Sequence, residues 1–376
     1  MASQKKLFLL TTESSGDLLG ARLLAALKPN VPGLEVRGVG GEKLKAEGMH
    51  LVRAVSDFNV MGLVEVLSQL SRLRAMFAEL VEDLRTWQPD VVVLIDAPDF
   101  NLRFAKALRG LGIPVVYYVS PQVWAWRKGR AKKIAKLVDH MMVLFRFETE
   151  IYHQYGLKTT WVGHPLVDEV TCDTSRAAFL AEEGLDPSRP LVALAPGSRR
   201  KEVKSLLPTM LDVAKAKGDR YQFAIPAAPT IDTGLMKQLM AEAGVQIPIL
   251  PGKMRPLIRH ADAAVVASGT ATLETGLLGT PMIVGYRLQR LSYALAKRLV
   301  QLDNIALVNI VLGRRVVPEL IQDAFNPDTI WTELEPLLED AAHRREVEAE
   351  LARLPEALGG GGAANRAAAV VKDYLI

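Results

Sequence analysis

The stretch VVVLIDAPDFN, residues 91–101, places two carboxylates at the end of an apolar run. An unbroken run of β-branched and aliphatic residues is typical of an interior strand in a parallel sheet. Ligands of such sheets bind just beyond the carboxyl ends of the strands. A chemical role is therefore expected for Asp96, which directly follows the run, or for Asp99, which lies beyond Pro98.

The segment TTESSGDLLG, residues 11–20, forms the first predicted strand-to-helix junction and supplies Glu13, Ser15 and Asp17 as polar groups. Asp17 either caps the helix that follows or contacts a substrate, and the sequence leaves both alternatives open. Neighbouring parallel strands end at one edge of a sheet, so we expect Glu13 and Asp96 to face the same cleft.

Two loops of the second half have the residues to bind phosphate: APGSRRKEV, residues 195–203, and ASGTATLE, residues 267–274. Backbone N–H groups, a helix dipole and a guanidinium can together bind a diphosphate, while a carboxylate accepts hydrogen bonds from ribose hydroxyls. Ordinary strand-to-helix turns are the alternative, because Gly and Ser commonly start helices. Together the loops predict a nucleotide diphosphate site made of Gly197, Ser198, Arg199, Ser268, Gly269, Thr270, Thr272 and Glu274.

The familiar nucleotide motifs do not fit. There is no GxxxxGK[ST] sequence, and GVGGEK, residues 38–43, has Lys43 where GxGxxG requires glycine. Nucleoside triphosphate hydrolysis and nicotinamide chemistry are therefore disfavoured.

The segment YYVSPQVWAWRKGRAKKIAK, residues 117–136, mixes aromatic and cationic side chains. This pattern suits a phosphate-bearing or sugar ligand and also single-stranded nucleic acid, whereas a solvated helix face is the alternative.

Residues 61–77, MGLVEVLSQLSRLRAMF, form an apolar helical stripe that is wider than one core face requires. It is either a core helix or a partly exposed surface for acyl chains or a membrane, with arginines placed to meet acidic head groups. The residues proposed for lipid contact are Met61, Leu63, Val64, Val66, Leu67, Leu70, Arg72, Leu73 and Arg74.

Composition narrows the class of protein. The net charge of +4 favours anionic partners. Cys172 is the only cysteine, and the six histidines show no metal-ligand spacing, so neither a disulfide nor a structural zinc is expected. The apolar start is too short for a signal peptide, and no run approaches the roughly 18 apolar residues of a spanning helix, so a cytosolic or peripheral protein is expected.

The elements that must position these residues alternate in type. Short apolar runs and helical stretches follow one another in both halves, which predicts an α/β fold of two doubly wound, Rossmann-like domains facing across a cleft. The predicted domains are residues 1–164 and 165–358. After the GGGG break, a terminal helix within residues 363–376 is expected to pack back on the first domain or onto a second subunit.

These motifs resemble the lipid-A-disaccharide synthase family over nearly the whole chain. The resemblance is carried by ESSGD, VMGLVEVL, IDAPDFN, YYVSPQVWAWR, VGHPLVDEV, PGSR, ASGTATLE with PMIVGYR, and VNIVLGRRVVPELIQ. Thr12 departs from the pattern, which usually has glycine before the glutamate.

The resemblance implies a GT-B fold with the nucleotide in the second domain. It implies an inverting glycosyltransferase that moves diacylglucosamine from UDP-2,3-diacylglucosamine to the 6-hydroxyl of 2,3-diacylglucosamine 1-phosphate in lipid A biosynthesis. It further implies that no metal ion or other cofactor is needed, and that the enzyme lies peripherally at the cytoplasmic face of the inner membrane. A homodimer formed through the C-terminal segment is an added expectation.

Within such a transfer, Asp96 is our candidate base, because a carboxylate in reach of the acceptor hydroxyl can take its proton. Glu13 could share that proton, while Asp99 is expected to cap or orient the loop. Arg199 and the helix that starts near Thr270 would neutralise the departing UDP. The resemblance also places three later residues near the cleft: Asn309, Arg315 and Gln322.

Two other functions remain as alternatives. One is another GT-B enzyme on UDP-N-acetylglucosamine, such as a 2-epimerase or a peptidoglycan transferase. The other is a non-catalytic nucleic-acid-binding protein built on the basic aromatic segment, although nucleic acid is not the partner we expect.

Overall fold

The computed structural model describes residues 4–58, 66–124, 129–288 and 303–376. The chain divides into two compact units, which are described separately. The first comprises Met1–Pro165 with Gly361–Ile376, and the second comprises Leu166–Gly360.

The first unit is built on a parallel sheet with strand order β3-β2-β1-β4-β5-β6-β7. Its strands are β1 (Lys6–Leu10), β2 (Glu35–Gly40), β3 (His50–Ala54), β4 (Val91–Ile95), β5 (Val115–Tyr118), β6 (His140–Val143) and β7 (Lys158–Trp161). The central strands are unbroken apolar runs because helices cover both faces of the sheet.

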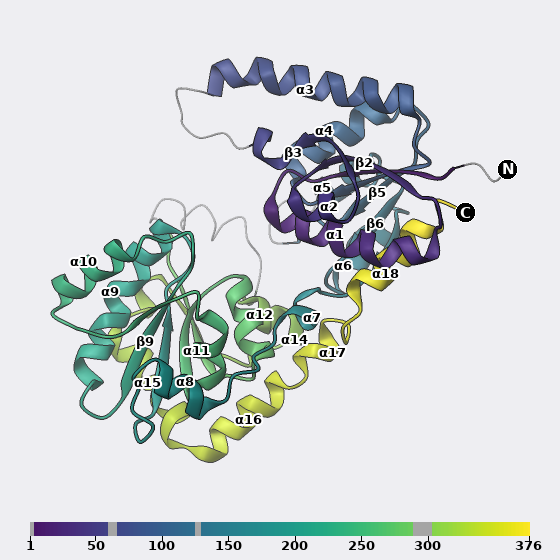
Figure 1. The fold of residues 1–376 in the computed structure, drawn as a ribbon. Helices are drawn as coiled ribbons and strands as arrows, with labels where there is room; N and C mark the ends of the chain where they lie inside the picture. The colour runs from purple at the N-terminus through teal and green to yellow at the C-terminus, as the bar shows by residue number, and fades with distance from the viewer. Residues whose placement is uncertain (1–3, 59–65, 125–128, 289–302) are drawn as a thin grey trace. The chain divides into compact units, whose positions relative to one another are not determined.

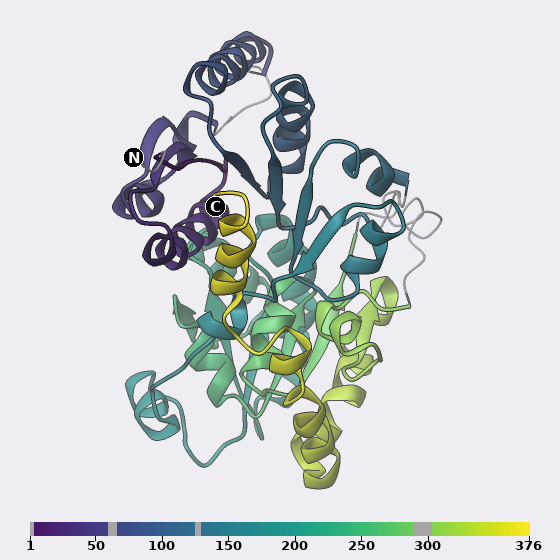
Figure 2. The ribbon, with the colours of Figure 1, turned by 90° about the vertical axis from the view of Figure 1, so that its right-hand side faces the viewer.

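The helices of this unit are α1 (Ser14–Leu27), α2 (Glu42–Ala46), α3 (Val66–Trp87), α4 (Pro98–Leu108), α5 (Gly129–Ile134), α6 (Glu148–His153) and α18 (Ala363–Lys372), with 3₁₀ turns η1 (Lys28–Asn30) and η2 (Val55–Phe58). Side chains alternate between the faces of each strand. Ile95 therefore meets Gly20 of α1, whereas Leu94 packs in one cluster with Leu80 of α3 and Phe104 of α4. The two helix layers are visible in Figure 2.

The C-terminal helix α18 lies beside α1 within the first unit (Figure 1). The Arg366 side chain donates from Nε to the Val162 carbonyl at 2.8 Å, and the Tyr374 hydroxyl lies 3.2 Å from Nδ1 of His140. The end of the chain is thus anchored to the last strands of the first sheet.

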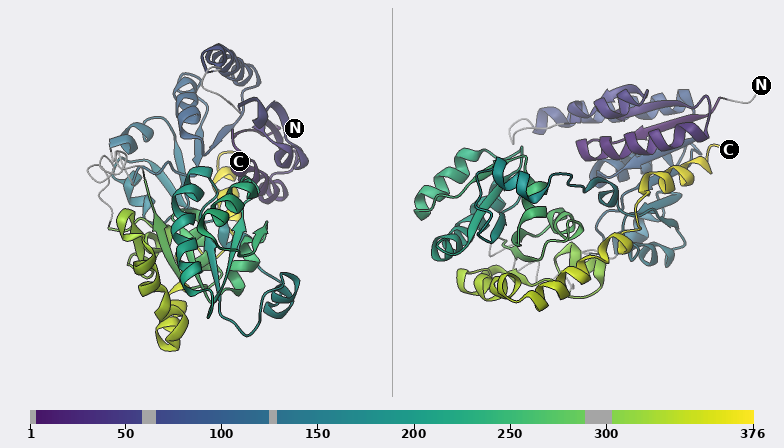
Figure 3. Two further views of the ribbon diagram at one scale, coloured as in Figure 1. Left: turned by 90° about the vertical axis from the view of Figure 1, so that its left-hand side faces the viewer. Right: turned by 60° about the horizontal axis from the view of Figure 1, so that its bottom comes forward.

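The second unit has a parallel sheet with strand order β10-β9-β8-β11-β12-β13. Its strands are β8 (Leu191–Ala195), β9 (Gln222–Ala227), β10 (Ile249–Pro251), β11 (Ala263–Ala267), β12 (Met282–Tyr286) and β13 (Glu319–Ile321). Its helices are α7 (Leu166–Glu169), α8 (Arg176–Glu182), α9 (Arg200–Lys217), α10 (Thr233–Ala243), α11 (Met254–His260), α12 (Thr270–Leu277), α14 (Leu307–Leu312), α15 (Pro327–Glu339), α16 (Ala341–Leu351) and α17 (Leu354–Ala357), with η3 (Gln322–Ala324). Figure 3 shows α15, α16 and α17 following one another along this unit.

Both sheets reverse their strand order at one point, and ligands of doubly wound sheets bind at that point. In the first unit the reversal lies between β1 and β4, which pair from Leu7 with Val91 to Leu10 with Leu94. In the second unit it lies between β8 and β11. The predicted α/β fold of two Rossmann-like domains is confirmed. Within the described ranges, every helix is too short or too polar to cross a bilayer.

Candidate active site

Asp96 occupies a strained turn directly after β4. Its φ is 51°, and Ala97 follows with φ 44°, so two successive non-glycine residues adopt the left-handed conformation. Such residues cluster at functional sites, where the surrounding structure must enforce them. Here the Asp96 carbonyl accepts the Tyr117 hydroxyl at 2.5 Å and the Asn101 side-chain amide at 2.8 Å. The Asp96 N–H donates to the Tyr118 carbonyl at 2.9 Å, so the turn is held from three sides.

The carboxylate of Asp96 has an elevated pKa. Burial is the largest cause, the negative charge of Glu13 is the second, and a hydrogen bond from the Ala97 N–H partly offsets them. Glu13 precedes α1 at the end of β1 and is exposed. The structure therefore brings Glu13 and Asp96 together at the strand-order reversal of the first sheet. A carboxylate whose pKa is raised accepts a proton more readily than an ordinary aspartate.

In the loop before α9, the N–H groups expected to bind phosphate already donate to the side chain of Glu202. Glu202 accepts the N–H groups of Ser198 at 3.1 Å and Arg199 at 3.2 Å, and it pairs with the Arg199 guanidinium at 2.8 Å. Gly197, with φ 110°, is needed here because a Cβ would lie 2.4 Å from a Glu202 oxygen. A diphosphate that binds these N–H groups must displace Glu202, and the 81 % exposed side chain of Arg199 must leave Glu202 to turn towards a phosphate.

The loop before α12 is open by comparison. Gly269 has φ 145°, and among the residues that the structure describes no side chain caps the start of this helix. The buried Thr272 donates from Oγ1 to the Gly269 carbonyl at 2.8 Å, and Ser268 donates to the Ile305 carbonyl at 3.2 Å. These two side chains fix the loop, while Thr270 is exposed. The first N–H groups of α12 are therefore the better anchor for a phosphate.

Glu274 lies one turn into α12 and is half-buried. Its carboxylate is 3.4 Å from the Arg255 guanidinium, which orients it. A carboxylate fixed beside a phosphate anchor is suited to accept hydrogen bonds from hydroxyl groups.

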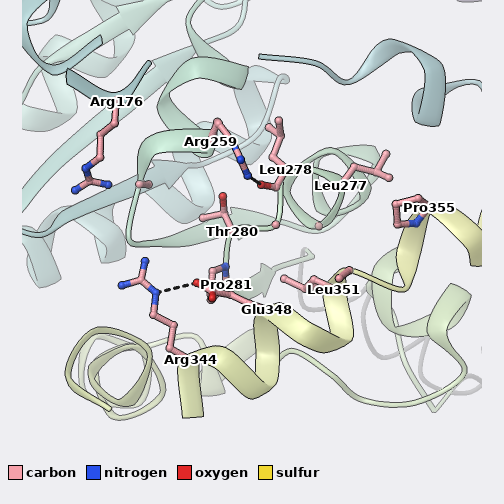
Figure 4. Close-up of a pocket in the computed structure, with 14 residues that line it drawn as sticks. Arg176, Arg259, Leu277, Leu278, Thr280, Pro281, Arg344, Glu348, Leu351 and Pro355 are labelled. Carbon is pink, nitrogen blue, oxygen red and sulfur yellow. Dashed lines mark hydrogen bonds and ion pairs between the residues drawn. The ribbon is translucent and has the colours of Figure 1, made fainter. Parts of the chain in front are cut away.

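A separate cavity of about 450 Å³ lies at the other edge of the second sheet, beside the residues that directly precede β11 and β12 (Figure 4). Arg176, Arg259 and Arg344 line it. Asp262 pairs with Arg176 at 2.7 Å and with Arg344 at 3.4 Å, while Arg259 donates to a backbone carbonyl. Because these cations are engaged within the protein and lie away from both phosphate loops, we do not assign the cavity to the site.

Comparison with known proteins decides the family. Residues 7–372 match the family model described as lipid-A-disaccharide synthetase. Proteins named lipid-A-disaccharide synthase from Geobacter metallireducens and Syntrophus aciditrophicus are 42 % and 44 % identical to the chain. The alignments cover 100 % and 99 % of this chain, and 98 % of each relative. The chain belongs to the lipid-A-disaccharide synthase family.

Membership in the lipid-A-disaccharide synthase family makes the chain an enzyme, a glycosyltransferase of lipid A biosynthesis, and confirms the resemblance found in the sequence. The nucleic-acid-binding alternative is not favoured. Two of the aromatic residues that suggested it, Tyr117 and Tyr118, are only 0 % and 1 % exposed and offer no stacking surface, and Trp126 lies outside the described residues.

Solved structures share the fold at much lower identity. A putative UDP-N-acetylglucosamine 2-epimerase from Listeria monocytogenes aligns with TM-score 0.67 and 16 % identity, covering 99 % of this chain and 97 % of that one. The Neisseria meningitidis UDP-GlcNAc 2-epimerase bound to UDP-GlcNAc aligns with TM-score 0.62 and 13 % identity, covering 98 % of each chain. At these identities the likeness establishes the GT-B type of fold and no activity.

Other predicted residues of the first unit have definite places. Asp17 is buried and accepts the N–H groups of Gly41 at 2.6 Å, Lys43 at 3.1 Å and Leu44 at 3.2 Å. Asp17 therefore caps α2 and does not cap its own helix. Its carboxylate oxygens are engaged by these N–H groups, so it is not available as a ligand contact. Ser15 is exposed in the first turn of α1.

Asp99 was predicted to cap or orient its loop, but α4 has no side-chain cap. The Asp99 side chain is 97 % exposed and lies 3.7 Å from the Arg130 guanidinium. Its partner is thus Arg130 of α5, and not a group of the loop that it was expected to shape.

The three late residues serve backbone contacts in this structure. The Asn309 amide donates to the Val317 carbonyl and to Glu319, and its oxygen accepts the N–H groups of Val316 and Val317. All of its hydrogen-bonding groups are therefore used inside the protein. The Gln322 amide both accepts from and donates to the backbone of Leu288, and Arg315 is exposed with one bond to the Glu319 carbonyl.

Only part of the apolar stripe lies within the residues that the structure describes. Met61, Leu63 and Val64 lie outside the described residues, and nothing is described of the side chains of Val66, Leu67 and Leu70 in α3. Further along α3, Arg72 and Arg74 are exposed and Leu73 is half-buried. The later turns pack into the core through Met76, Leu80 and Leu84.

Several residues of the site region were not predicted. Tyr117 and Asn101 hold the Asp96 turn, and Glu202 covers the start of α9. Glu148 is buried near the ends of β5 and β6. Burial raises its pKa to about 7, although hydrogen bonds from Phe145, Trp124 and other neighbours act to lower it. The SPQVW motif marks this region in the sequence, whereas the left-handed conformation of Val119, with φ 75°, and the burial of Glu148 become visible only in the folded chain.

Proposed function

We propose that the chain transfers diacylglucosamine from UDP-2,3-diacylglucosamine to the 6-hydroxyl of 2,3-diacylglucosamine 1-phosphate in one displacement with inversion. The products are lipid A disaccharide 1-phosphate and UDP. The observation that carries this proposal is the Asp96 turn: a strained, firmly held carboxylate with a raised pKa at the strand-order reversal of the first sheet.

In this reaction Asp96 accepts the proton of the acceptor hydroxyl as its oxygen attacks the anomeric carbon. Base catalysis needs a group that is ionised in the resting site and basic enough to take the proton, which a raised pKa favours. The negative charge of Glu13 makes Asp96 more basic. Glu13 thus supports the proton transfer through its charge.

The second unit stabilises the leaving diphosphate. A diphosphate at the start of α12 would accept hydrogen bonds from the N–H groups there, and Arg199 would supply a positive charge. Glu274 would accept hydrogen bonds from the ribose. A metal ion is not required in this scheme, because the helix end and the guanidinium offset the developing charge. Within the described ranges no three acidic, His or Cys side chains are grouped to bind one.

We also propose that the enzyme lies peripherally at the cytoplasmic face of the inner membrane, because both proposed substrates carry acyl chains. The sequence pI near 9.0 and the exposed Arg72 and Arg74 on α3 favour an acidic lipid surface. Dimer formation through the C-terminal segment stays a prediction.

The test is the release of UDP from UDP-diacylglucosamine with and without diacylglucosamine 1-phosphate. The proposal expects UDP release only when the acceptor is present. UDP release without acceptor would favour hydrolysis or epimerisation, as in the alternative GT-B enzymes. Full activity in EDTA is expected as well, and a loss that Mg²⁺ restores would contradict the metal-free scheme.

A further inference from the structure

A basic groove lies between α4 and α5 in the first unit, with a volume of about 740 Å³. Its charged lining consists of Asp99, Arg103 and Lys106 from α4 and Arg130 and Lys133 from α5. We call it the α4–α5 groove. None of its cations was assigned to the site above.

The positions of these residues follow from helical spacing. Asp99, Arg103 and Lys106 are separated by four and three residues, so they share one face of α4, and Arg130 and Lys133 share one face of α5 in the same way. At a rise of 1.5 Å per residue, the stretch from Asp99 to Lys106 extends about 10 Å along α4. Two facing helices thus present four cations over the length of a monosaccharide ligand.

The charge of the groove is poorly compensated. Arg130 is 3.7 Å from Asp99, and that carboxylate is almost fully exposed to water. Among the described residues, no carboxylate forms an ion pair with Arg103, Lys106 or Lys133. Four positive side chains against one negative side chain leave a strong attraction for an anion.

The groove begins at the turn that carries the candidate base. Pro98 and Asp99, which line it, follow Asp96 by two and three residues. At the α5 side, the charge of Arg130 is close enough to act on Tyr117, whose hydroxyl holds the Asp96 carbonyl. A ligand that places its hydroxyl at Asp96 can therefore reach the groove with its other end.

We propose that the α4–α5 groove binds the phosphomonoester of the acceptor, with Arg103 and Lys106 as the residues that select a phosphorylated acceptor. The inference rests on the function proposed above. A phosphomonoester carries close to two negative charges near pH 7 and offers three acceptor oxygens, which suit a guanidinium fork flanked by ammonium groups. A hydroxyl in its place would leave these cations without a partner.

The test compares two acceptors, diacylglucosamine 1-phosphate and diacylglucosamine without the phosphate, in mixed detergent micelles. The variants are Arg103→Ala and Lys106→Ala, and the matched control is Arg109→Ala. Arg109 follows the same helix but pairs with Asp139 at 3.5 Å, away from the groove. Both groove variants replace exposed side chains, so the fold should tolerate them.

For each groove variant we expect the KM for the phosphorylated acceptor to rise about tenfold, because one charge-assisted contact is lost. The KM for the donor and the rate with the unphosphorylated acceptor should match the wild type, and Arg103→Lys should recover most of the loss. Arg109→Ala should behave like the wild type with both acceptors.

Equal losses with both acceptors, or no loss with either, would overturn the proposal. If the equal losses came with weaker pelleting on phosphatidylglycerol vesicles, the groove would instead bind lipid head groups. A wild-type enzyme that transfers to neither acceptor would overturn the proposed function itself, which separates the two failures.

Discussion

Replacing Asp96 by Asn tests the role of the carboxylate separately from the role of the turn that carries it. The two side chains have the same shape, and Asn tolerates the left-handed conformation at least as well as Asp does. The Asp96 backbone bonds to Tyr117, Asn101 and Tyr118 involve main-chain atoms and are kept. The change therefore removes the base and leaves the turn intact.

The expected loss in kcat is 10²- to 10⁴-fold, the usual contribution of a general base, which corresponds to about 3–5 kcal/mol of barrier. Donor affinity should not change, because the predicted diphosphate site is in the second unit. The assay is acceptor-dependent UDP release, with UDP binding measured in parallel. Asp219→Asn, in the exposed turn between α9 and β9, is the control. Turnover of Asp96→Asn near that of the control would refute the role of Asp96.

The free energy of unfolding of Asp96→Asn provides a second measurement on the same variant. The folded-state pKa of Asp96 is raised, so ionisation of this group opposes folding. That penalty is absent below the pKa of the unfolded chain and complete above the folded-state pKa. Asp96→Asn should therefore be no less stable than the wild type at pH 7. Asp96→Ala should be less stable than Asp96→Asn by about 1 kcal/mol, because alanine is poorly tolerated at φ 51°. Urea denaturation that placed Asn below Ala would contradict this explanation of the turn.

Four further substitutions test other parts of the account. Glu13→Gln should move the acid limb of kcat/KM to lower pH, because it removes one cause of the raised Asp96 pKa; a collapse of turnover would assign the base to Glu13 instead. Asp17→Ala should lower the free energy of unfolding by about 1–3 kcal/mol, since three backbone N–H groups lose their acceptor, and an unchanged urea midpoint would exclude this. Between pH 4.5 and about 7, native Glu148 keeps a proton that the unfolded chain has lost, so the stability of the wild type should fall as pH rises through this range. Glu148→Gln should remove this part of the fall. Parallel plots of unfolding free energy against pH for the two proteins would contradict it. Arg199→Ala should lower kcat roughly hundredfold by removing a charge beside the leaving UDP, and unchanged kinetics would reject that role.

The strands were predictable because each is a short apolar run that ends in polar residues. The run before Asp96 is β4, and the loops at Gly197 and Gly269 follow β8 and β11. Since parallel strands end at one edge, the sequence also indicated which polar residues gather there. Local pattern and the rules of parallel sheets thus account for the fold and for the neighbourhood of Glu13 and Asp96.

Contacts between distant segments were not predictable in this way. Asp17 caps a helix that begins 25 residues later, and a cap to its own helix would give the same local sequence. Glu202 occupies the loop N–H groups that a phosphate was expected to take, because a glutamate in the first turn of a helix competes for them. Asn309 looked like a polar loop residue but is buried in a network that includes Glu319. In each case a side chain satisfies backbone groups whose partners only the folded chain reveals.

The most direct test of the central claim is the anomeric configuration of the product. The purified enzyme would be given UDP-2,3-diacylglucosamine and 2,3-diacylglucosamine 1-phosphate, and the disaccharide would be examined by NMR. A single displacement assisted by Asp96 predicts a bond to the 6-hydroxyl of the acceptor with the configuration of the donor sugar inverted. Retained configuration, or a free sugar in place of the disaccharide, would contradict it.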